Sequence, residues 1–346
     1  MTRIAALLCL AAALALDAPD APAQARASAT DQGVEVELSL DRTDIVVGEP
    51  VHLVVRVYNR SASYPIGNFG AKLFFTEGND VRVMVQSPGE LGVRFEGADQ
   101  AIIYPSVEVD LRMGEQWHEV LPLIHEKRNS NGYVFNKPGR FIVSASLTCT
   151  ILREATQTRV DLPPTAVTVS PPEGRAAEAF ALVSNPDAAR AFQLGSTDNE
   201  AVLTAVRRVA ADFADTPYAP YALYLSGTGA MRAQSPRYEQ AIRDLRLFVE
   251  RHRDHPKAPA ALFNIVLCHV GLNDTDTARD WFWYLWDFDR SYALLRKENP
   301  TASFFYFRNL EKVSARRWWM LDRPWDTSGL GGTAANAAAP SEALPE

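Results

Sequence analysis

Cysteine is scarce in this sequence, which excludes a fold held together by disulfide bonds. The chain has 346 residues and three cysteines, and Cys9 lies in an apolar segment near the beginning. Cys149 and Cys268 stand in regions with different sequence patterns, so we expect two buried free thiols and no bridge. Cys149 keeps step with an apolar series that alternates from Phe141 to Leu147, which points it towards a core.

An excess of positive charge is also missing. The formal net charge is −7, residues 34–171 hold 13 basic against 17 acidic side chains, and residues 172–320 hold 19 against 18. Proteins that bind nucleic acid or anionic membranes carry a clear basic excess. We therefore expect neither kind of partner.

The longest apolar run is too short to span a membrane. It extends from Ile4 to Leu16, follows the basic Arg3 and stops at Asp17, whereas a spanning helix needs about 20 apolar residues. Small residues precede a possible cleavage point after Ala25. Residues 1–25 are therefore predicted to be a secretory signal peptide, and the mature chain to be periplasmic or extracellular with no transmembrane segment.

Motifs for catalysis, metals and cofactors are lacking. The pairs His118-Glu119 and His125-Glu126 are the best candidate metal ligands, but they lie in a predicted strand and lack the helical spacing of a zinc site. The tripeptide His252-Arg253-Asp254 occurs without the other kinase motifs, and residues 273–276 lack the glycine and glutamate of a calcium loop. We predict no catalytic residue, no metal and no cofactor.

Residues 34–171 show the period of two that is typical of β-strands. Polar side chains alternate with Val34, Val36, Leu38 and Leu40, and turn residues separate this run from the next. Further strands are predicted at 45–47, 51–57, 71–76, 81–86, 92–95, 101–107, 117–123, 139–152 and 157–169. Short strands at this spacing favour an antiparallel β-sandwich.

A family resemblance supports the sandwich. The run LSLDRTDIVVGEPVHLVVRVYN at 38–59 and the run KPGRFIVSA at 137–145 resemble bacterial immunoglobulin-like domains. The resemblance implies an immunoglobulin-like β-sandwich at 34–171 and implies nothing about a ligand. This region lacks the Cys, Trp and Cys core signature and is longer than the usual 100 residues or so, so 59–110 is expected to hold an insertion.

An internal repeat organises the second half of the chain. The segment DTPYAPYALY at 215–224 returns 39 residues later as DHPKAPAALF at 254–263. The prolines are expected to end one helix and begin the next, and the alanines to allow close packing of helices. Apolar residues at 238–252 recur with helical spacing and predict an amphipathic helix.

These residues resemble tetratricopeptide repeats of secreted bacterial envelope proteins, with a third, weaker copy at 276–285. The resemblance implies a short helical solenoid at 172–325, although the period of 39 exceeds the usual 34. Such solenoids hold peptides or proteins in a groove. The predicted fold class is thus multidomain β + α, a sandwich followed by a solenoid, and residues 326–346 are predicted to be a disordered tail.

Aromatic residues gather at the end of the helical region. Six of the seven tryptophans lie between 281 and 325, and successive residues of a helix turn by about 100°, so they cannot all share one face. An aromatic surface for a protein or peptide partner is predicted at Trp281, Trp283, Trp286, Trp318 and Trp319, while burial of these rings in a solenoid cap is the alternative.

Two further functions stay open. One is an enzyme or accessory subunit that acts on cell-envelope polymer, with Asp280, Asp287 and Asp289 as the acids within the aromatic cluster. The other is a structural spacer whose solenoid docks on its own sandwich. The sequence does not determine the partner, the oligomeric state or the packing of the two domains.

Overall fold

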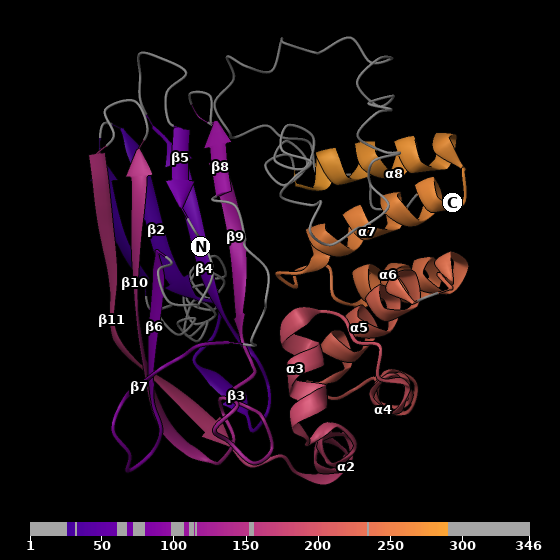
Figure 1. Cartoon of the computed structure of the whole chain (residues 1–346), viewed down its shortest axis with the longest axis horizontal. Coiled ribbons are helices and arrows are strands. Elements are labelled where there is room, and N and C mark those ends of the chain that lie inside the picture. Colours follow the sequence, from indigo (N-terminus) through magenta and orange to yellow (C-terminus); the bar gives the residue numbers. More distant parts are fainter. Residues whose placement is uncertain are drawn as a thin grey trace, which may run out of the picture.

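A computed structural model of the chain describes residues 26–31, 33–60, 68–71, 80–97, 107–110, 114, 116–151, 156–233 and 235–289. Strands occupy the first half of this part and helices the second (Figure 1). In the described part, the last strand, β11, ends at Ser170 and the first helix, α2, begins at Gly174. The change from strands to helices therefore falls where the sequence changes its period.

The strands form two sheets. They are β1 (Arg26–Asp31), β2 (Val34–Leu40), β3 (Asp44–Val46), β4 (Val51–Asn59), β5 (Asn68–Ala71), β6 (Val81–Gln86), β7 (Val93–Arg94), β8 (Val107–Asp110), β9 (Gln116–Leu123), β10 (Gly139–Ile151) and β11 (Thr156–Ser170). Sheet A has the order β1-β2-β4-β9. Sheet B has the order β3-β11-β10-β5-β8, with β6 also paired to β10 and β7 paired to β6.

Two features of the sheets differ from the prediction. Strand β1 was not predicted, because the apolar residues that alternate in its sequence RASATD are only two alanines, and it forms by antiparallel pairing with β2. The pairing of β3 with β11 is parallel, so sheet B is not antiparallel throughout. The expected strands at 71–76 and 101–107 lie almost wholly outside the described residues, where only Ala71 and Val107 are seen as strand ends.

The apolar residues of the two sheets share one core. Val36 and Leu38 of sheet A and Phe141 and Val143 of sheet B are all fully buried members of a single cluster. Along β10 buried and half-buried residues alternate, as the period of two predicted. Cys149 is buried and has a free thiol, as expected.

The helices begin and end close to the positions that the sequence predicted. They are α2 (Gly174–Val183), α3 (Pro186–Leu194), α4 (Glu200–Asp212), α5 (Ala219–Arg232), α6 (Tyr238–Arg251), α7 (Ala258–Gly271) and α8 (Thr275–Phe288). The repeated turns lead into α5 and α7, which have proline in the first turn. The beginning of α4 is capped by the side chain of Asn199, which accepts from the backbone amides of Ala201 and Val202.

Glycines of α5 explain how tightly the helices pack. A Cβ atom on Gly227 would lie 2.6 Å from Cγ of Leu245 in α6, and one on Gly229 would lie 2.6 Å from Cδ2 of Leu203 in α4. Close helix approach therefore depends on these glycines as well as on the predicted alanines.

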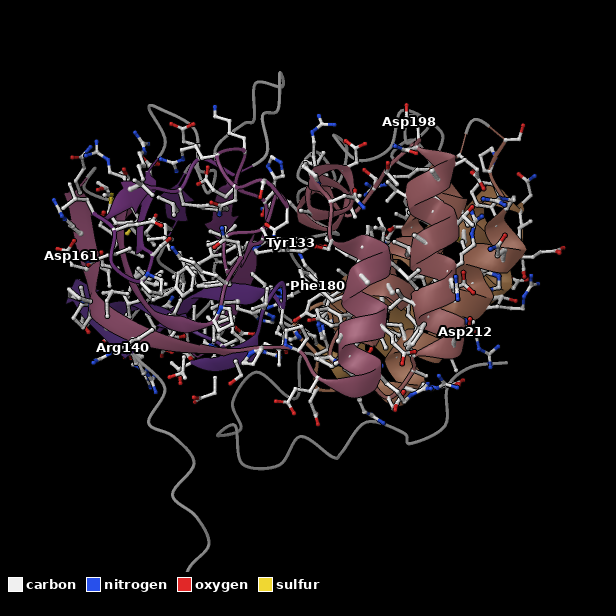
Figure 2. The ribbon with its side chains drawn as sticks, turned by 90° about the horizontal axis from the view of Figure 1, so that it is seen from below. Tyr133, Arg140, Asp161, Phe180, Asp198 and Asp212 are labelled. Atoms are coloured by element: carbon white, nitrogen blue, oxygen red, sulfur yellow. The ribbon has the colours of Figure 1, made fainter. Side chains whose placement is uncertain are left out.

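The helices are stacked beside the sheets, from α2 to α8, on the side where β9 lies (Figure 1). Tyr133 and Phe180 mark the boundary between the two parts in Figure 2, and their rings lie 5.5 Å apart. Within the described residues, no helix has both the length and the apolar character needed to cross a membrane.

Candidate functional site

The sheets and the helices are joined by hydrogen bonds from buried side chains. The hydroxyl of Tyr218, just before α5, donates to the carbonyl of Val47 at 2.6 Å, and the hydroxyl of Tyr133 donates to the carbonyl of Val183 at the end of α2 at 2.9 Å. Buried hydrogen bonds of this kind are costly to break. They fix the helices in one orientation on the sheets.

Gln193 of α3 makes the same junction with three further hydrogen bonds. Its side-chain oxygen accepts from the backbone amides of Ile124 and His125 at 2.9 and 3.2 Å, and its nitrogen donates to the carbonyl of Pro122 at 2.8 Å. These backbone groups follow or end β9, an edge strand of sheet A. The helix thus satisfies polar groups that the sheet leaves unpaired.

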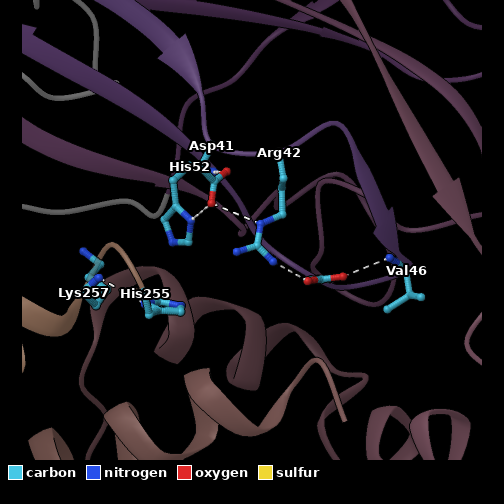
Figure 3. A network of polar contacts seen from close by, with 7 residues as sticks. Asp41, Arg42, Val46, His52, His255 and Lys257 are labelled. Atoms are coloured by element: carbon cyan, nitrogen blue, oxygen red, sulfur yellow. Dashed lines mark hydrogen bonds and ion pairs between the residues drawn. The ribbon is translucent and has the colours of Figure 1, made fainter. Parts of the chain in front are cut away.

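A polar network lies on the sheet side of this junction (Figure 3). His52 projects from β4 on the side opposite to Val51 and Leu53, which fill the core, and it is only 1% exposed. Its Nδ1 lies 2.8 Å from Oδ2 of Asp41, and its backbone amide donates to Oδ1 of Asp41 at 2.7 Å. Asp41 stands at the turn after β2, so local chain geometry brings the two side chains together.

Arg42 extends the network to Glu49. Its Nε donates to Asp41 at 3.2 Å, and its Nη1 donates to Oε1 of Glu49 at 2.7 Å. The second oxygen of Glu49 accepts from the backbone amide of Val46 at 3.1 Å. Figure 3 shows the chain of contacts that runs from His52 through Asp41 and Arg42 to Val46.

Burial and hydrogen bonding set the charges of the network. Burial lowers the pKa of His52 and keeps the imidazole neutral. Burial also opposes ionisation of Asp41, but the hydrogen bonds from His52 and the charge of Arg42 outweigh it, so the pKa of Asp41 lies below its usual value. Since an ionised carboxylate only accepts hydrogen bonds, Nδ1 of His52 carries the proton. Burial raises the pKa of Glu49 despite its contacts with Val46 and Arg42.

Aromatic side chains from the helices close over this network. Tyr221, in the first turn of α5, stacks against His52 with ring centroids 5.9 Å apart. His255, in the turn before α7, meets His52 edge-on at 5.7 Å and Tyr221 edge-on at 5.1 Å. The three rings therefore form one cluster between sheet A and the beginnings of α5 and α7.

This cluster borders a cleft of about 380 Å³. The lining residues come from the sheet side and from both repeated turns: Arg42, Glu49, Pro217, Pro220, Tyr221, Arg251, His252, Arg253, Asp254 and His255. The volume falls within the range of small-molecule binding sites. We call it the interdomain cleft because it lies between the sheet side and the helices, and we regard it as the candidate functional site.

Three polar atoms of the interdomain cleft are buried without a hydrogen-bond partner. They are the hydroxyl oxygen of Tyr221 and the Nε2 atoms of His252 and His255. Buried polar groups are normally paired, and an unpaired one costs about 1–3 kcal/mol. A bound molecule with complementary polar atoms would offset this cost.

One catalytic arrangement can be compared with the cleft, a nucleophile that a histidine activates. A histidine held by an aspartate, as His52 is by Asp41, occurs in hydrolases where the histidine activates a nucleophile. Among the described residues that line the cleft, the hydroxyl belongs to Tyr221 and no serine, threonine or cysteine is present. Burial raises the pKa of Tyr221, so its hydroxyl stays protonated and is a poor nucleophile.

The structure separates the predicted aromatic residues. Trp281 is fully buried against the helical core, with the guanidinium of Arg246 over its ring at 5.6 Å, so it contributes to stability and not to an exposed surface. Trp283 and Trp286 are half-buried and meet edge-on with centroids 5.8 Å apart. Trp318 and Trp319 lie outside the described residues.

The candidate metal ligands are engaged elsewhere. Nε2 of His118 lies 3.5 Å from Oδ2 of Asp289, His125 pairs with Tyr133 in a β-bridge, and Glu126 accepts from Arg128 at 2.7 Å. The described part of the chain contains no group of three side chains that could hold a metal ion. By contrast His252, Arg253 and Asp254 line the interdomain cleft, which the sequence did not reveal.

The three acids suggested for polymer chemistry do not converge. Asp280 and Asp287 are exposed on α8, whereas Asp289 faces His118 of β9. A glycosidase needs two carboxyl groups that face each other across a substrate. These three side chains give no such pair.

No protein-family model matches the sequence. No curated protein is significantly similar to it. Among solved structures, the chain is similar to a β-glucosidase from Listeria innocua, free and in complex with gluconolactone, at 19% and 16% sequence identity and TM-scores of 0.22 and 0.20. Each match covers 39% of this chain and 16% of the β-glucosidase, and a likeness this low carries no argument.

Proposed function

We propose that the chain is a non-catalytic binding protein that acts outside the cytoplasm and holds a protein or peptide partner. The observation that carries this proposal is the interdomain cleft, whose buried polar atoms on Tyr221, His252 and His255 have no partner within the described chain. The lack of a serine, threonine or cysteine nucleophile among the described lining residues favours binding over catalysis.

The finer fold assignment is part of the proposal. We infer an immunoglobulin-like sandwich at 34–171 and a tetratricopeptide-like solenoid at 172–325. The shared residues of the two repeated turns and the pairing of α6 with α5 and α7 support repeated helical units.

The partner is proposed to enter the interdomain cleft, with the aromatic residues of α8 as a separate surface. Arg253 lines the cleft and covers the ring of Phe288 at 5.4 Å. Trp283 and Trp286 lie on the side of α8 opposite to Phe288, because successive residues of a helix turn by about 100°. The two surfaces can therefore be tested one at a time.

A selection from displayed random peptides tests the binding function. The purified chain is the bait, and recovered peptides are titrated against three proteins: wild type, Tyr221→Phe with His255→Asn, and Trp283→Ala with Trp286→Ala. We expect micromolar binding that the first double variant loses and the second keeps. Loss in the second variant alone would move the site to α8. If selection yields no peptide that prefers the folded over the denatured chain, the binding function is wrong.

The location is tested by the N-terminus of the exported protein. Expression of the full sequence in a bacterium, followed by intact mass measurement of the periplasmic fraction, is expected to give a chain that begins at Arg26. A soluble cytoplasmic product that retains Met1 would contradict secretion. β1 begins at Arg26, so cleavage there would leave the strand intact.

A structural spacer is the second candidate. The hydrogen bonds made by Tyr133, Tyr218 and Gln193 favour a spacer, since they hold the sheets and the helices together without any ligand. A spacer would bind nothing in the cleft. The peptide selection therefore separates the two candidates.

A further inference from the structure

We propose that the interdomain cleft binds a carboxylate, and that in the partner proposed above this group is the free C-terminus of a peptide. The inference rests on the proposed function and adds the chemistry that the site recognises. It follows from an imbalance in the cleft, where the acids of the sheet side already accept hydrogen bonds and two donors of the helical side have no acceptor.

The acceptors on the sheet side are occupied. Asp41 accepts from His52 through both of its oxygens and from Arg42 through one. Glu49 accepts from Arg42 with one oxygen and from the backbone amide of Val46 with the other. Neither carboxylate is therefore directed at the polar atoms of the helical side.

The donors on the helical side lack acceptors. Nδ1 of His255 accepts the backbone amide hydrogen of Lys257 at 3.0 Å, so a neutral His255 must carry its proton on Nε2. Burial, with the charges of neighbouring groups such as Arg42, lowers the pKa of His255 to about 2 and keeps the ring neutral. The buried Nε2 is therefore a donor of known tautomer without an acceptor.

Tyr221 supplies the second unmatched donor. Its side chain is 7% exposed, its ring lies 5.1 Å from that of His255, and its hydroxyl has no partner. Burial raises its pKa, so the hydroxyl keeps its hydrogen. Two rings in contact, Tyr221 and His255, thus carry one unmatched donor each, and a carboxylate has two oxygens that each accept a hydrogen bond.

Charge on the helical side favours an anion. The lining residues that the helices contribute include two basic side chains, Arg251 and Arg253, and one acid, Asp254. The pKa values of His252 and His255 are lowered, so these rings add no positive charge at neutral pH. Arg42 is already shared by Asp41 and Glu49. One singly charged ligand would therefore balance the helical side, whereas a doubly charged phosphate would exceed it.

The size of the cleft favours the end of a peptide. Arg251 and Asp254 are exposed at its rim, so a chain that enters with its terminus can continue into solvent. A volume of about 380 Å³ accommodates a terminal residue or two and not a folded segment. The same chemistry also allows a free small carboxylate to bind, and the experiment separates these sources.

The test compares free and blocked carboxylates on the purified full chain. The probes are random hexapeptides with a free or an amidated C-terminus, N-acetylglycine or its amide, and inorganic phosphate, with binding followed by saturation-transfer NMR and calorimetry. Tyr221→Phe and His255→Asn each remove one unmatched donor. The asparagine keeps an acceptor for the amide of Lys257.

Tyr218→Phe is the matched control, because it also removes a buried hydroxyl at the junction, but one that is already paired with Val47. We expect at least a tenfold loss of affinity in Tyr221→Phe and His255→Asn, and no loss in Tyr218→Phe. Without ligand, Tyr221→Phe should melt no lower than wild type, because its hydroxyl is unpaired, whereas Tyr218→Phe should melt lower.

The outcomes separate this inference from the proposed function. Equal binding of free and amidated peptides overturns the carboxylate inference and leaves peptide binding intact. Binding of N-acetylglycine without any peptide keeps the carboxylate site and refutes the peptide partner. If phosphate binds as tightly as a carboxylate, the inference is overturned. It is also overturned if Tyr221→Phe and His255→Asn bind the probes with the affinity of wild type.

Discussion

The loop of Gly132 against α3 offers a sharp test of how the two domains are joined. Gly132 has φ of 80°, and a Cβ atom there would lie 2.4 Å from Cα of Pro186 and 3.1 Å from Cβ of Ala189. Gly89 has nearly the same backbone, with φ of 75°, yet a Cβ atom there would meet nothing within 4 Å. Gly132→Ala and Gly89→Ala therefore share backbone strain and differ in their contact with the helix.

The expected magnitudes follow from these two terms. A left-handed conformation costs a residue with a Cβ about 1–2 kcal/mol, which applies to both variants. Overpacking adds about 1–3 kcal/mol at Gly132, because the nearest atom belongs to the backbone at the beginning of α3 and cannot rotate away. We expect Gly89→Ala to lower the free energy of unfolding by about 1–2 kcal/mol, and Gly132→Ala to lower it by about 2–5 kcal/mol.

Hydrogen exchange locates the damage. The amides of Ile124 and His125 are held by the side chain of Gln193 on α3, so displacement of the helix by Gly132→Ala should speed their exchange. Gly89→Ala should leave it unchanged. Equal losses of stability in the two variants, or unchanged protection of these two amides in Gly132→Ala, would refute the view that α3 is wedged directly against this loop.

Three further predictions concern stability and reactivity. The pKa of His255 is about 2 in the folded state and near 6.5 in the unfolded state, so between pH 7 and pH 5 the unfolded state binds a proton that the folded state does not. The free energy of unfolding of wild type, measured in urea, should therefore fall by about 2 kcal/mol more than that of His255→Asn over this range. Equal losses in the two proteins would contradict this. Cys149 and Cys268 should resist a thiol reagent in the native protein and both react after denaturation without reductant, and an unreactive pair would indicate a disulfide. Gly227→Ala should destabilise α5 by about 1–3 kcal/mol against Leu245 although alanine favours helices, and a higher melting temperature would contradict the close contact.

The regular elements were predictable where the signal is local. The helical spacing between Tyr238 and His252 predicted the buried face of α6, and Ala241, Leu245 and Phe248 are fully buried there. Strand β1 was missed because pairing with β2, and not its own sequence, makes it a strand. The parallel pairing of β3 with β11 depends on where distant segments meet, which periodicity does not record.

The candidate site was not predictable because its two walls are far apart in the sequence. Asp41 and His52 belong to the first strands, whereas Tyr221 and His255 belong to the repeated turns. One signal was present in the repeat itself. Tyr221 occupies the position of Ala260, and His255 the position of Thr216, so the turns differ where they line the cleft.

That difference bears on what the repeat does. Its shared residues form helix ends and close contacts, so they are needed wherever two such units stack. Its unshared residues face sheet A, where a spacer would be stabilised by paired or apolar side chains and loses stability through unpaired donors. Both tyrosines of the first turn are unshared residues. The hydroxyl of Tyr218 is paired with the carbonyl of Val47, as expected of a spacer, whereas the hydroxyl of Tyr221, three residues later, has no partner. Two tyrosines with similar burial and opposite pairing within one turn are better explained if the first holds the domains together and the second is kept for an acceptor from outside the chain.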